Sequence, residues 1–118
     1  MIKTKRVYEG ADHADGARFL VDRLWPRGVK KEALALKGWL KDAAPSNDLR
    51  HWYHHDLDQW GEFRRRYFSE LKQNPEAWQP LLEAARHGTI TLLYGSKNTE
   101  HNNADALKEF LNERLHEG

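Results

Sequence analysis

The segment Thr89-Ile90-Thr91-Leu92-Leu93-Tyr94 is a run of β-branched and apolar residues between Gly88 and Gly95. Such a run between two glycines is typical of a strand that is buried on both faces, as strands of a parallel sheet are. The segment Phe19-Leu20-Val21 has the same continuous apolar character. We therefore predict two buried strands. The earlier one ends before Pro26, because proline cannot donate a hydrogen bond within a sheet.

Strand and helix patterns alternate around these two segments. Residues 2–8 mix β-branched and aromatic residues with Lys and Arg, which predicts a strand near the edge of a sheet. Residues 9–16 are typical of a polar loop, and residues 34–40 fit either an irregular segment or a short extended one. Residues 58–72 carry large apolar side chains three or four positions apart, which predicts a long amphipathic helix. These side chains are Trp60, Phe63, Tyr67 and Leu71.

Shorter helical segments complete the pattern. Residues 30–34 predict a helical turn, and Ser46 or Asn47 can cap a helix, because a short side-chain oxygen accepts from the first backbone N–H groups. A helix that ends at Gly88 is expected to hold Pro80 in its first turn, where a missing N–H group does no harm. The final helix follows the loop after the last strand and directs five apolar side chains inward. These are Ala104, Leu107, Phe110, Leu111 and Leu115.

The order of these elements predicts a single α/β domain over residues 1–118. Its sheet is small and mainly parallel, with three to four strands, and is flanked by the 58–72 helix and the final helix. A chain of 118 residues buries about two-thirds of its unfolded surface, so one core suffices. Five Trp, four Tyr and four Phe predict that aromatic rings fill much of this core.

Composition narrows the classes of function. Nineteen Lys and Arg against eighteen Asp and Glu give a net charge of +1, short of the basic excess usual in nucleic-acid binders. The absence of Cys excludes disulfides, thiolate metal sites and a cysteine nucleophile, and fits a reducing compartment. No signal-peptide pattern and no run of about twenty apolar residues occurs. We therefore predict a cytoplasmic protein without a membrane partner.

The ends of the two buried strands predict where a ligand binds, because open α/β sheets bind ligands beyond the carboxyl ends of their strands. If the segments 19–21 and 89–94 are parallel neighbours, the residues that follow them meet at one crevice. Arg23, Arg27 and Lys97 supply positive charge there, and the final helix begins with free backbone N–H groups. We predict that this crevice binds, or acts on, a small anionic or nucleotide-like ligand.

Polar residues near the same strand ends suggest roles in such a site. Asp22 is expected to orient the ligand or act as a base, Tyr94 to donate a proton, and Asn98 and Asn102 to add polar contacts. A purely structural interpretation is also open, in which Asp22 pairs with a neighbouring arginine and the asparagines cap a helix and brace a turn. The ligand-binding interpretation is favoured if Arg23, Arg27 and Lys97 point into a shared concavity, and a structural role is favoured if they are separated or fully paired with Asp and Glu.

A second function remains as the alternative, namely a non-enzymatic interaction or nucleic-acid-binding module. The segment Arg64-Arg65-Arg66 lies in the 58–72 helix, where its side chains fan around the helix axis. Further basic residues and exposed aromatic rings would complete a surface that tracks phosphates and stacks bases. The basic residues are Lys3, Lys5, Arg6, Lys30 and Lys31.

Histidines cluster at His51, His54 and His55, and two of them are four positions apart, a spacing found in zinc sites. No Glu accompanies them in the pattern of zinc proteases, so a solvated helix end is the preferred interpretation and no metal is predicted. Dinucleotide, phosphate-loop and nucleophile-elbow glycine motifs are also missing, so no cofactor is predicted either.

Four groups of residues resemble the YeaO-like branch of domain-of-unknown-function family 488, over nearly the whole chain. They are Leu20-Val21-Asp22-Arg23-Leu24-Trp25-Pro26-Arg27-Gly28; Ala44-Pro45-Ser46 with Leu49-Arg50; Phe63-Arg64, Tyr67 and Glu70-Leu71; and Thr91-Leu92-Leu93-Tyr94 with Lys97 and Asn102-Asn103-Ala104. The resemblance implies a small bacterial cytoplasmic protein without an established activity.

The resemblance also bears on catalysis. Another branch of the wider family carries a Cys-His-Arg triplet at the start of the final helix, where this chain has Asn102-Asn103-Ala104. If that cysteine acts as a nucleophile, the same chemistry does not transfer to this chain, because the thiol is missing.

Overall fold

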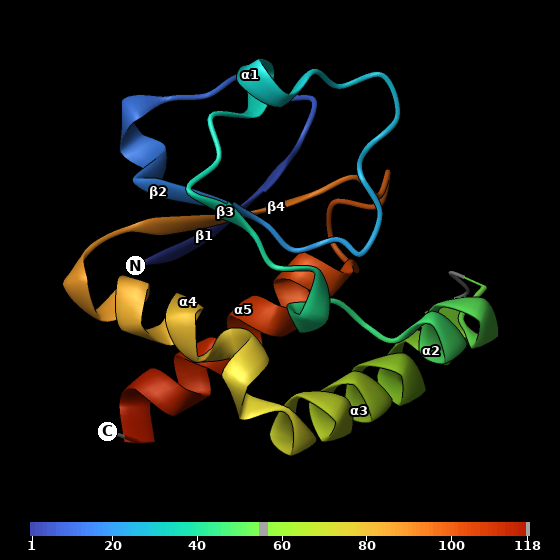
Figure 1. The fold of residues 1–118 in the computed structure, drawn as a ribbon. Helices are drawn as coiled ribbons and strands as arrows, with labels where there is room; N and C mark the ends of the chain where they lie inside the picture. The colour runs from blue at the N-terminus through green and yellow to red at the C-terminus, as the bar shows by residue number, and fades with distance from the viewer. Residues whose placement is uncertain (55–56, 118) are drawn as a thin grey trace.

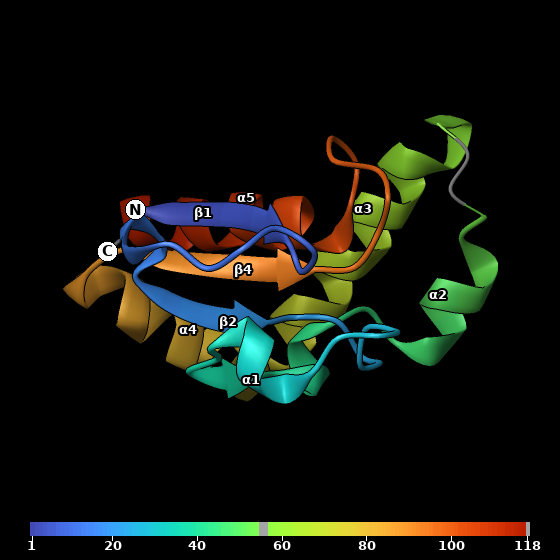
Figure 2. The ribbon, with the colours of Figure 1, turned by 90° about the horizontal axis from the view of Figure 1, so that it is seen from above.

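A computed structural model describes residues 1–54 and 57–117 and shows an α/β fold built on a parallel sheet (Figure 1). Its strands are β1 (Ile2–Arg6), β2 (Ala17–Leu20), β3 (Gly38–Trp39) and β4 (Ile90–Tyr94). They pair in parallel in the order β1-β4-β2-β3. The predicted fold class is confirmed, and the two strands predicted to be parallel neighbours, β2 and β4, lie side by side (Figure 2).

Helices cover one face of this sheet. α4 and α5 lie against it, and α3 packs on both of them, so that Figure 1 shows all three on the same side. The short α1 and the connecting loops lie on the other side. No helix in the described part of the chain is long and apolar enough to cross a membrane. The helices are α1 (Lys31–Leu34), α2 (Asn47–Trp52), α3 (Leu57–Gln73), α4 (Pro75–His87) and α5 (Asn103–Glu117), with 3-10 turns η1 (His13–Asp15) and η2 (Lys41–Ala43).

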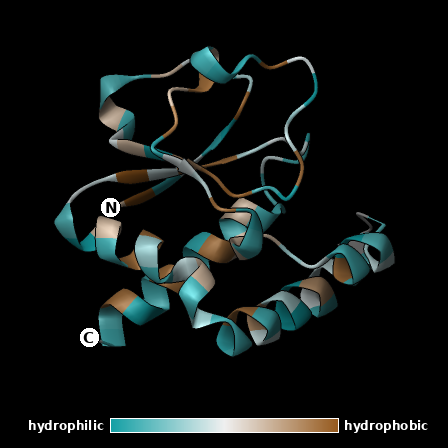
Figure 3. Ribbon diagram, viewed as in Figure 1, coloured by the Kyte–Doolittle hydropathy of each residue, from teal (hydrophilic) through white to brown (hydrophobic). Residues whose placement is uncertain are grey.

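Each face of the sheet has its own hydrophobic core. The larger core lies on the helix side, where Tyr67 and Phe110 are fully buried. The smaller core gathers around Leu20 and Leu93 and is covered by the Trp25 and Trp39 rings, which meet edge to face with centroids 5.2 Å apart. All five residues of β4 are therefore buried, which explains the continuous apolar run of that strand. Figure 3 shows the contrast between the hydrophobic β4 and the largely hydrophilic α3.

A buried ion pair lies at the amino end of β2. Asp15 and Arg18 are each only 4% exposed, and the Arg18 Nη1 donates to Asp15 Oδ2. The Arg18 Nε donates to the Leu34 carbonyl oxygen at 2.8 Å, and the Thr91 hydroxyl donates to the Asp15 carbonyl oxygen at 2.7 Å. These bonds join η1, β2, α1 and β4, and the sequence patterns did not indicate them.

The position predicted for Pro80 was wrong. α4 begins at Pro75, directly after Asn74, so Pro80 lies inside the helix rather than in its first turn. Pro75 occupies the first helical position, where the fixed φ of proline suits a helix and its missing N–H group has no partner to lose. The start of α4 at Pro75 is stabilised by Trp78, which is buried and donates from Nε1 to the Leu71 carbonyl oxygen at 2.7 Å.

Replacing Pro80 by alanine is expected to stabilise the protein. Pro80 is exposed, and a proline inside a helix removes a backbone hydrogen bond, so Pro80→Ala should raise the free energy of unfolding by about 1 kcal/mol or more. Pro75→Ala is the matched control and should give no gain, because Pro75 stands where proline is favoured. Urea denaturation of both variants measures the difference, and an equal effect of the two substitutions would contradict it.

Candidate functional site

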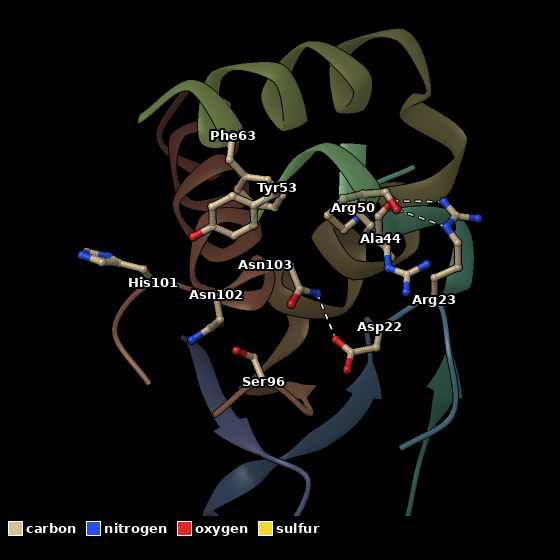
Figure 4. Close-up of a pocket in the computed structure, with 11 residues that line it drawn as sticks. Asp22, Arg23, Ala44, Arg50, Tyr53, Phe63, Ser96, His101, Asn102 and Asn103 are labelled. Carbon is tan, nitrogen blue, oxygen red and sulfur yellow. Dashed lines mark hydrogen bonds between the residues drawn. The ribbon is translucent and has the colours of Figure 1, made fainter. Parts of the chain in front are cut away.

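A cavity of about 90 Å³ lies beyond the carboxyl ends of β2 and β4, where the sequence placed a crevice (Figure 4). We call it the strand-end cavity. The chain after β2, the loop before α2, the α2–α3 region and the start of α5 form its walls. The residues that line it are Asp22, Arg23, Ala44, Pro45, Arg50, Tyr53, Phe63, Ser96, His101, Asn102 and Asn103.

Asp22 ties the two strand ends to α5. Its Oδ2 accepts from the Gly95 N–H at 2.8 Å, and its Oδ1 accepts from Asn103 Nδ2 at 3.0 Å. Burial raises the pKa of Asp22 above its ordinary value, although these two hydrogen bonds and the charge of Arg50 act in the opposite direction. Asp22 therefore contributes a hydrogen-bonded carboxylate to the wall of the cavity, as predicted from its place after β2.

Arg23 borders the cavity but directs its donors to the backbone. Its Nε donates to the Pro45 carbonyl oxygen at 3.1 Å, and its Nη2 donates to the Ala44 carbonyl oxygen at 3.2 Å. The exposed Asp42 lies 3.9 Å from Arg23 Nη1. Arg23 thus fixes the loop that leads into α2 and at the same time gives the cavity a partly buried positive charge.

Arg27 and Lys97 do not join Arg23. Both side chains are exposed, and neither lines the strand-end cavity. Arg27 follows Pro26 in the turn that reaches Gly28, whose φ of 76° is left-handed. The structure therefore brings only one of the three predicted cations to the cavity.

Tyr94, the predicted proton donor, is buried and does not line the cavity. Burial raises the pKa of its phenol, and the nearby carboxylates of Asp105 and Glu9 raise it further, although Arg6 opposes them. A phenol with a raised pKa in this position holds its proton and packs in the helix-side core.

The two predicted asparagines follow the structural interpretation in their contacts. Asn98 Oδ1 accepts from the backbone N–H of Glu100 and of His101, each at 2.9 Å, and so braces the loop after β4. Asn102 Oδ1 accepts from the Asp105 N–H at 2.9 Å and so caps α5. Asn102 also lines the cavity, whereas Asn98 does not.

Arg50 is a cavity residue that sequence reasoning missed. Its helix, α2, starts after Ser46, whose Oγ accepts from the Leu49 N–H at 3.1 Å, and Leu49 is buried. This orientation of α2 lets Arg50 extend toward Asp22 (Figure 4). The capping serine and the apolar Leu49 were visible signals for α2, but the sequence does not show that α2 brings Arg50 to the strand-end cavity.

Aromatic residues form the opposite wall and were also missed as cavity residues. The Tyr53 and Phe63 rings stack with centroids 4.3 Å apart. His101 lines the cavity, but its ring stacks on Trp60 with centroids 5.0 Å apart and points away from the other lining side chains (Figure 4). Phe63 had appeared only as an apolar position of the predicted 58–72 helix, and no local pattern marked Tyr53 or His101 as a cavity residue.

The structure gives little support to the two other candidate sites, the histidine cluster and the arginine segment of α3. His51 and His54 are exposed, and His55 lies outside the described residues. Within residues 1–54 and 57–117, no three His, Cys, Asp or Glu side chains gather as a metal site requires. The segment Arg64-Arg65-Arg66 is held in ion pairs with Glu62 and Glu109, so its charges are partly neutralised.

The fold and the cavity define a small α/β protein whose parallel sheet ends at a cavity lined by both polar and aromatic side chains. The family model described as "Inactive DUF488-N3 subclade" matches residues 1–118, and the chain belongs to this family. It is 44% identical to "Uncharacterized protein YeaO" of Escherichia coli over 93% of this chain and 96% of that protein. The family resemblance drawn from the sequence is thereby confirmed.

Two mycobacterial proteins extend the comparison. The chain is 37% identical to "Uncharacterized protein Mb3100c" of Mycobacterium bovis and to "Uncharacterized protein Rv3073c" of Mycobacterium tuberculosis. Each alignment covers 96% of this chain and 95% of the relative. No solved structure matches the chain.

Proposed function

We propose that this protein binds a small anionic ligand in the strand-end cavity without transforming it. The observation that carries the proposal is the gathering of Arg23 and Arg50 around one cavity that also meets the start of α5. Two guanidinium groups and the positive end of a helix favour an anion, and Asp22 is the one carboxylate among the lining residues. The positive charges of the two guanidinium groups therefore exceed the single negative charge of Asp22.

The size of the cavity favours a ligand of a few heavy atoms. Pockets that bury drug-sized molecules measure roughly 300–1,000 Å³. The strand-end cavity measures about 90 Å³. A simple carboxylate or oxyanion suits this volume, and a whole nucleotide does not. This narrows the ligand class from the broader one that the sequence suggested.

Binding without chemistry agrees with the residues around the cavity. The buried Tyr94 is not a lining residue, and both oxygens of Asp22 accept hydrogen bonds from the protein. The chain contains no cysteine. The description of the family subclade as inactive points in the same direction.

Calorimetric titration with phosphate, sulfate, acetate and propionate tests the proposal, and at least one of these anions is expected to bind the wild type. Arg50→Gln should weaken that binding by about tenfold or more, because a charge-assisted hydrogen bond is lost. Arg27→Gln is the matched control, since Arg27 is an exposed arginine outside the cavity, and it should leave the affinity unchanged.

A thermal melt gives a second readout of the same binding. An anion at ten times its dissociation constant should raise the melting temperature by roughly 5 °C, because it stabilises only the folded state. If none of the four anions binds, or if Arg27→Gln weakens binding as much as Arg50→Gln does, the proposal fails.

A further inference from the structure

Two opposite charges face the strand-end cavity without meeting. Asp22 and Arg50 both line it, and the charge of Arg50 acts on the Asp22 carboxylate. Among the described residues, however, no ion pair within 4.0 Å joins these two side chains. A group that fits between them must accept hydrogen bonds at one end and donate one at the other.

Both side chains retain the capacity to bind such a group. A carboxylate offers about four lone pairs, and Asp22 uses one for the Gly95 N–H and one for Asn103 Nδ2. A guanidinium offers five N–H donors, and Arg50 directs one of them, from Nη1, to Asn47 Oδ1 at 2.9 Å. Asp22 can therefore accept from a ligand while Arg50 donates to it.

The wall of the cavity that Tyr53 and Phe63 form is apolar. The stacked rings of Tyr53 and Phe63 line it and present a carbon surface to whatever lies between the two charges. A ligand with a short carbon skeleton gains contact there, whereas an inorganic oxyanion has no apolar part to bury.

We propose that the ligand is a small α-hydroxy carboxylate, whose carboxylate binds Arg50, whose hydroxyl donates to Asp22, and whose carbon atoms pack on Tyr53 and Phe63. This inference rests on the proposed anion-binding function and names its ligand class. A hydroxyl suits the donor end better than an ammonium group, because Arg23 and the start of α5 repel a second positive charge.

The comparison of lactate with propionate on the wild-type protein tests this inference. The two anions have the same charge and nearly the same size, and they differ by the one hydroxyl. Calorimetry at pH 7 should show lactate binding about tenfold more tightly or better, because a hydrogen bond to the partly buried Asp22 carboxylate is lost with propionate.

Two variants test which residues cause the difference in affinity between lactate and propionate. Asp22→Asn should bring the lactate and propionate affinities close together, and Arg50→Gln should weaken both by a similar factor and keep their ratio. Asp22→Asn also disturbs the bonds to Gly95 and Asn103, so its fold must be checked by circular dichroism. The wild-type comparison needs no variant and decides the inference by itself.

The outcomes separate this inference from the function on which it rests. Equal affinities for lactate and propionate, both lost in Arg50→Gln, would overturn the α-hydroxy carboxylate and keep the anion site. Tighter binding of alanine than of lactate would overturn it in favour of an amino acid. If neither acid and neither inorganic anion binds, both proposals fall.

Discussion

Gly16→Ala is expected to lower the free energy of unfolding by about 3 kcal/mol or more, because two separate penalties add at this position. Gly16 has φ 62° and ψ −140°, a conformation that is essentially restricted to glycine. A Cβ there would overlap the Thr89 carbonyl oxygen and lie 2.7 Å from its carbonyl carbon. That carbonyl accepts from the Ala17 N–H at 3.1 Å at the start of the β2–β4 pairing, so it cannot move away freely.

Substitutions at two other glycines distinguish the penalty from backbone strain from the penalty due to the overlap of the added Cβ. Gly28 has φ 76° but no atom within 4 Å of an added Cβ, so Gly28→Ala adds strain alone and should cost about 1 kcal/mol. Gly10 has neither feature, so Gly10→Ala should change stability by less than about 0.5 kcal/mol. Urea denaturation of the three variants should rank them in this order, and a Gly16→Ala variant as stable as Gly28→Ala would contradict the overlap with Thr89.

Asp15→Ala is expected to cost about 3–5 kcal/mol, because it leaves the buried Arg18 guanidinium without its carboxylate. The double variant Asp15→Ala with Arg18→Met should recover part of this loss, since no charge then remains buried. Asp42→Ala is the control, because Asp42 also pairs with an arginine but its side chain is 84% exposed, and it should have little effect. If the double variant is less stable than Asp15→Ala, the explanation by an unpaired charge is wrong.

The effect of Asp15 should also depend on pH. Burial by itself raises the pKa of Asp15, but the Asp12 N–H and the side chains of Arg18 and Lys5 lower it, and the net result is a pKa below its ordinary value of 3.8. The stabilisation by Asp15 is therefore complete above that ordinary value and is lost as the pH falls through the lower folded pKa. The difference in unfolding free energy between wild type and Asp15→Ala should be constant from about pH 7 to pH 5 and should shrink below about pH 4.

Sequence reasoning predicted those elements in which the pattern of apolar side chains reveals which faces are buried. β4 and the Phe19-Leu20 part of β2 are apolar because both faces of the sheet are covered, and α3 shows its buried stripe through Phe63, Tyr67 and Leu71. β3 has only two residues, too few for a pattern, and it pairs with β2 through backbone groups at Gly38 and Trp39. The segment 34–40 therefore could not be assigned from its side chains.

Some residues of the candidate site were likewise predicted from the sequence, and others were not. Asp22, Arg23 and Asn102 were predicted as site residues because they follow the parallel strands, and they line the cavity. Arg50 and His101 come to the cavity from α2 and from the loop after β4, through packing that no local spacing records. Sequence position alone therefore identified one side of the cavity and left the opposite side unassigned.

The place of β4 in the middle of the sheet has a consequence for how the protein is made. β1 is synthesised first, yet its partner in the sheet is β4, which leaves the ribosome only after four helices have been made. Until then, β1 has no strand to pair with, and the sheet cannot close. Assembly of this protein must therefore wait for nearly the whole chain and rely on distant contacts, as in other folds of high contact order. A nascent chain that stalls before Ile90 exposes unpaired strand edges, which is the state of the chain most prone to aggregation.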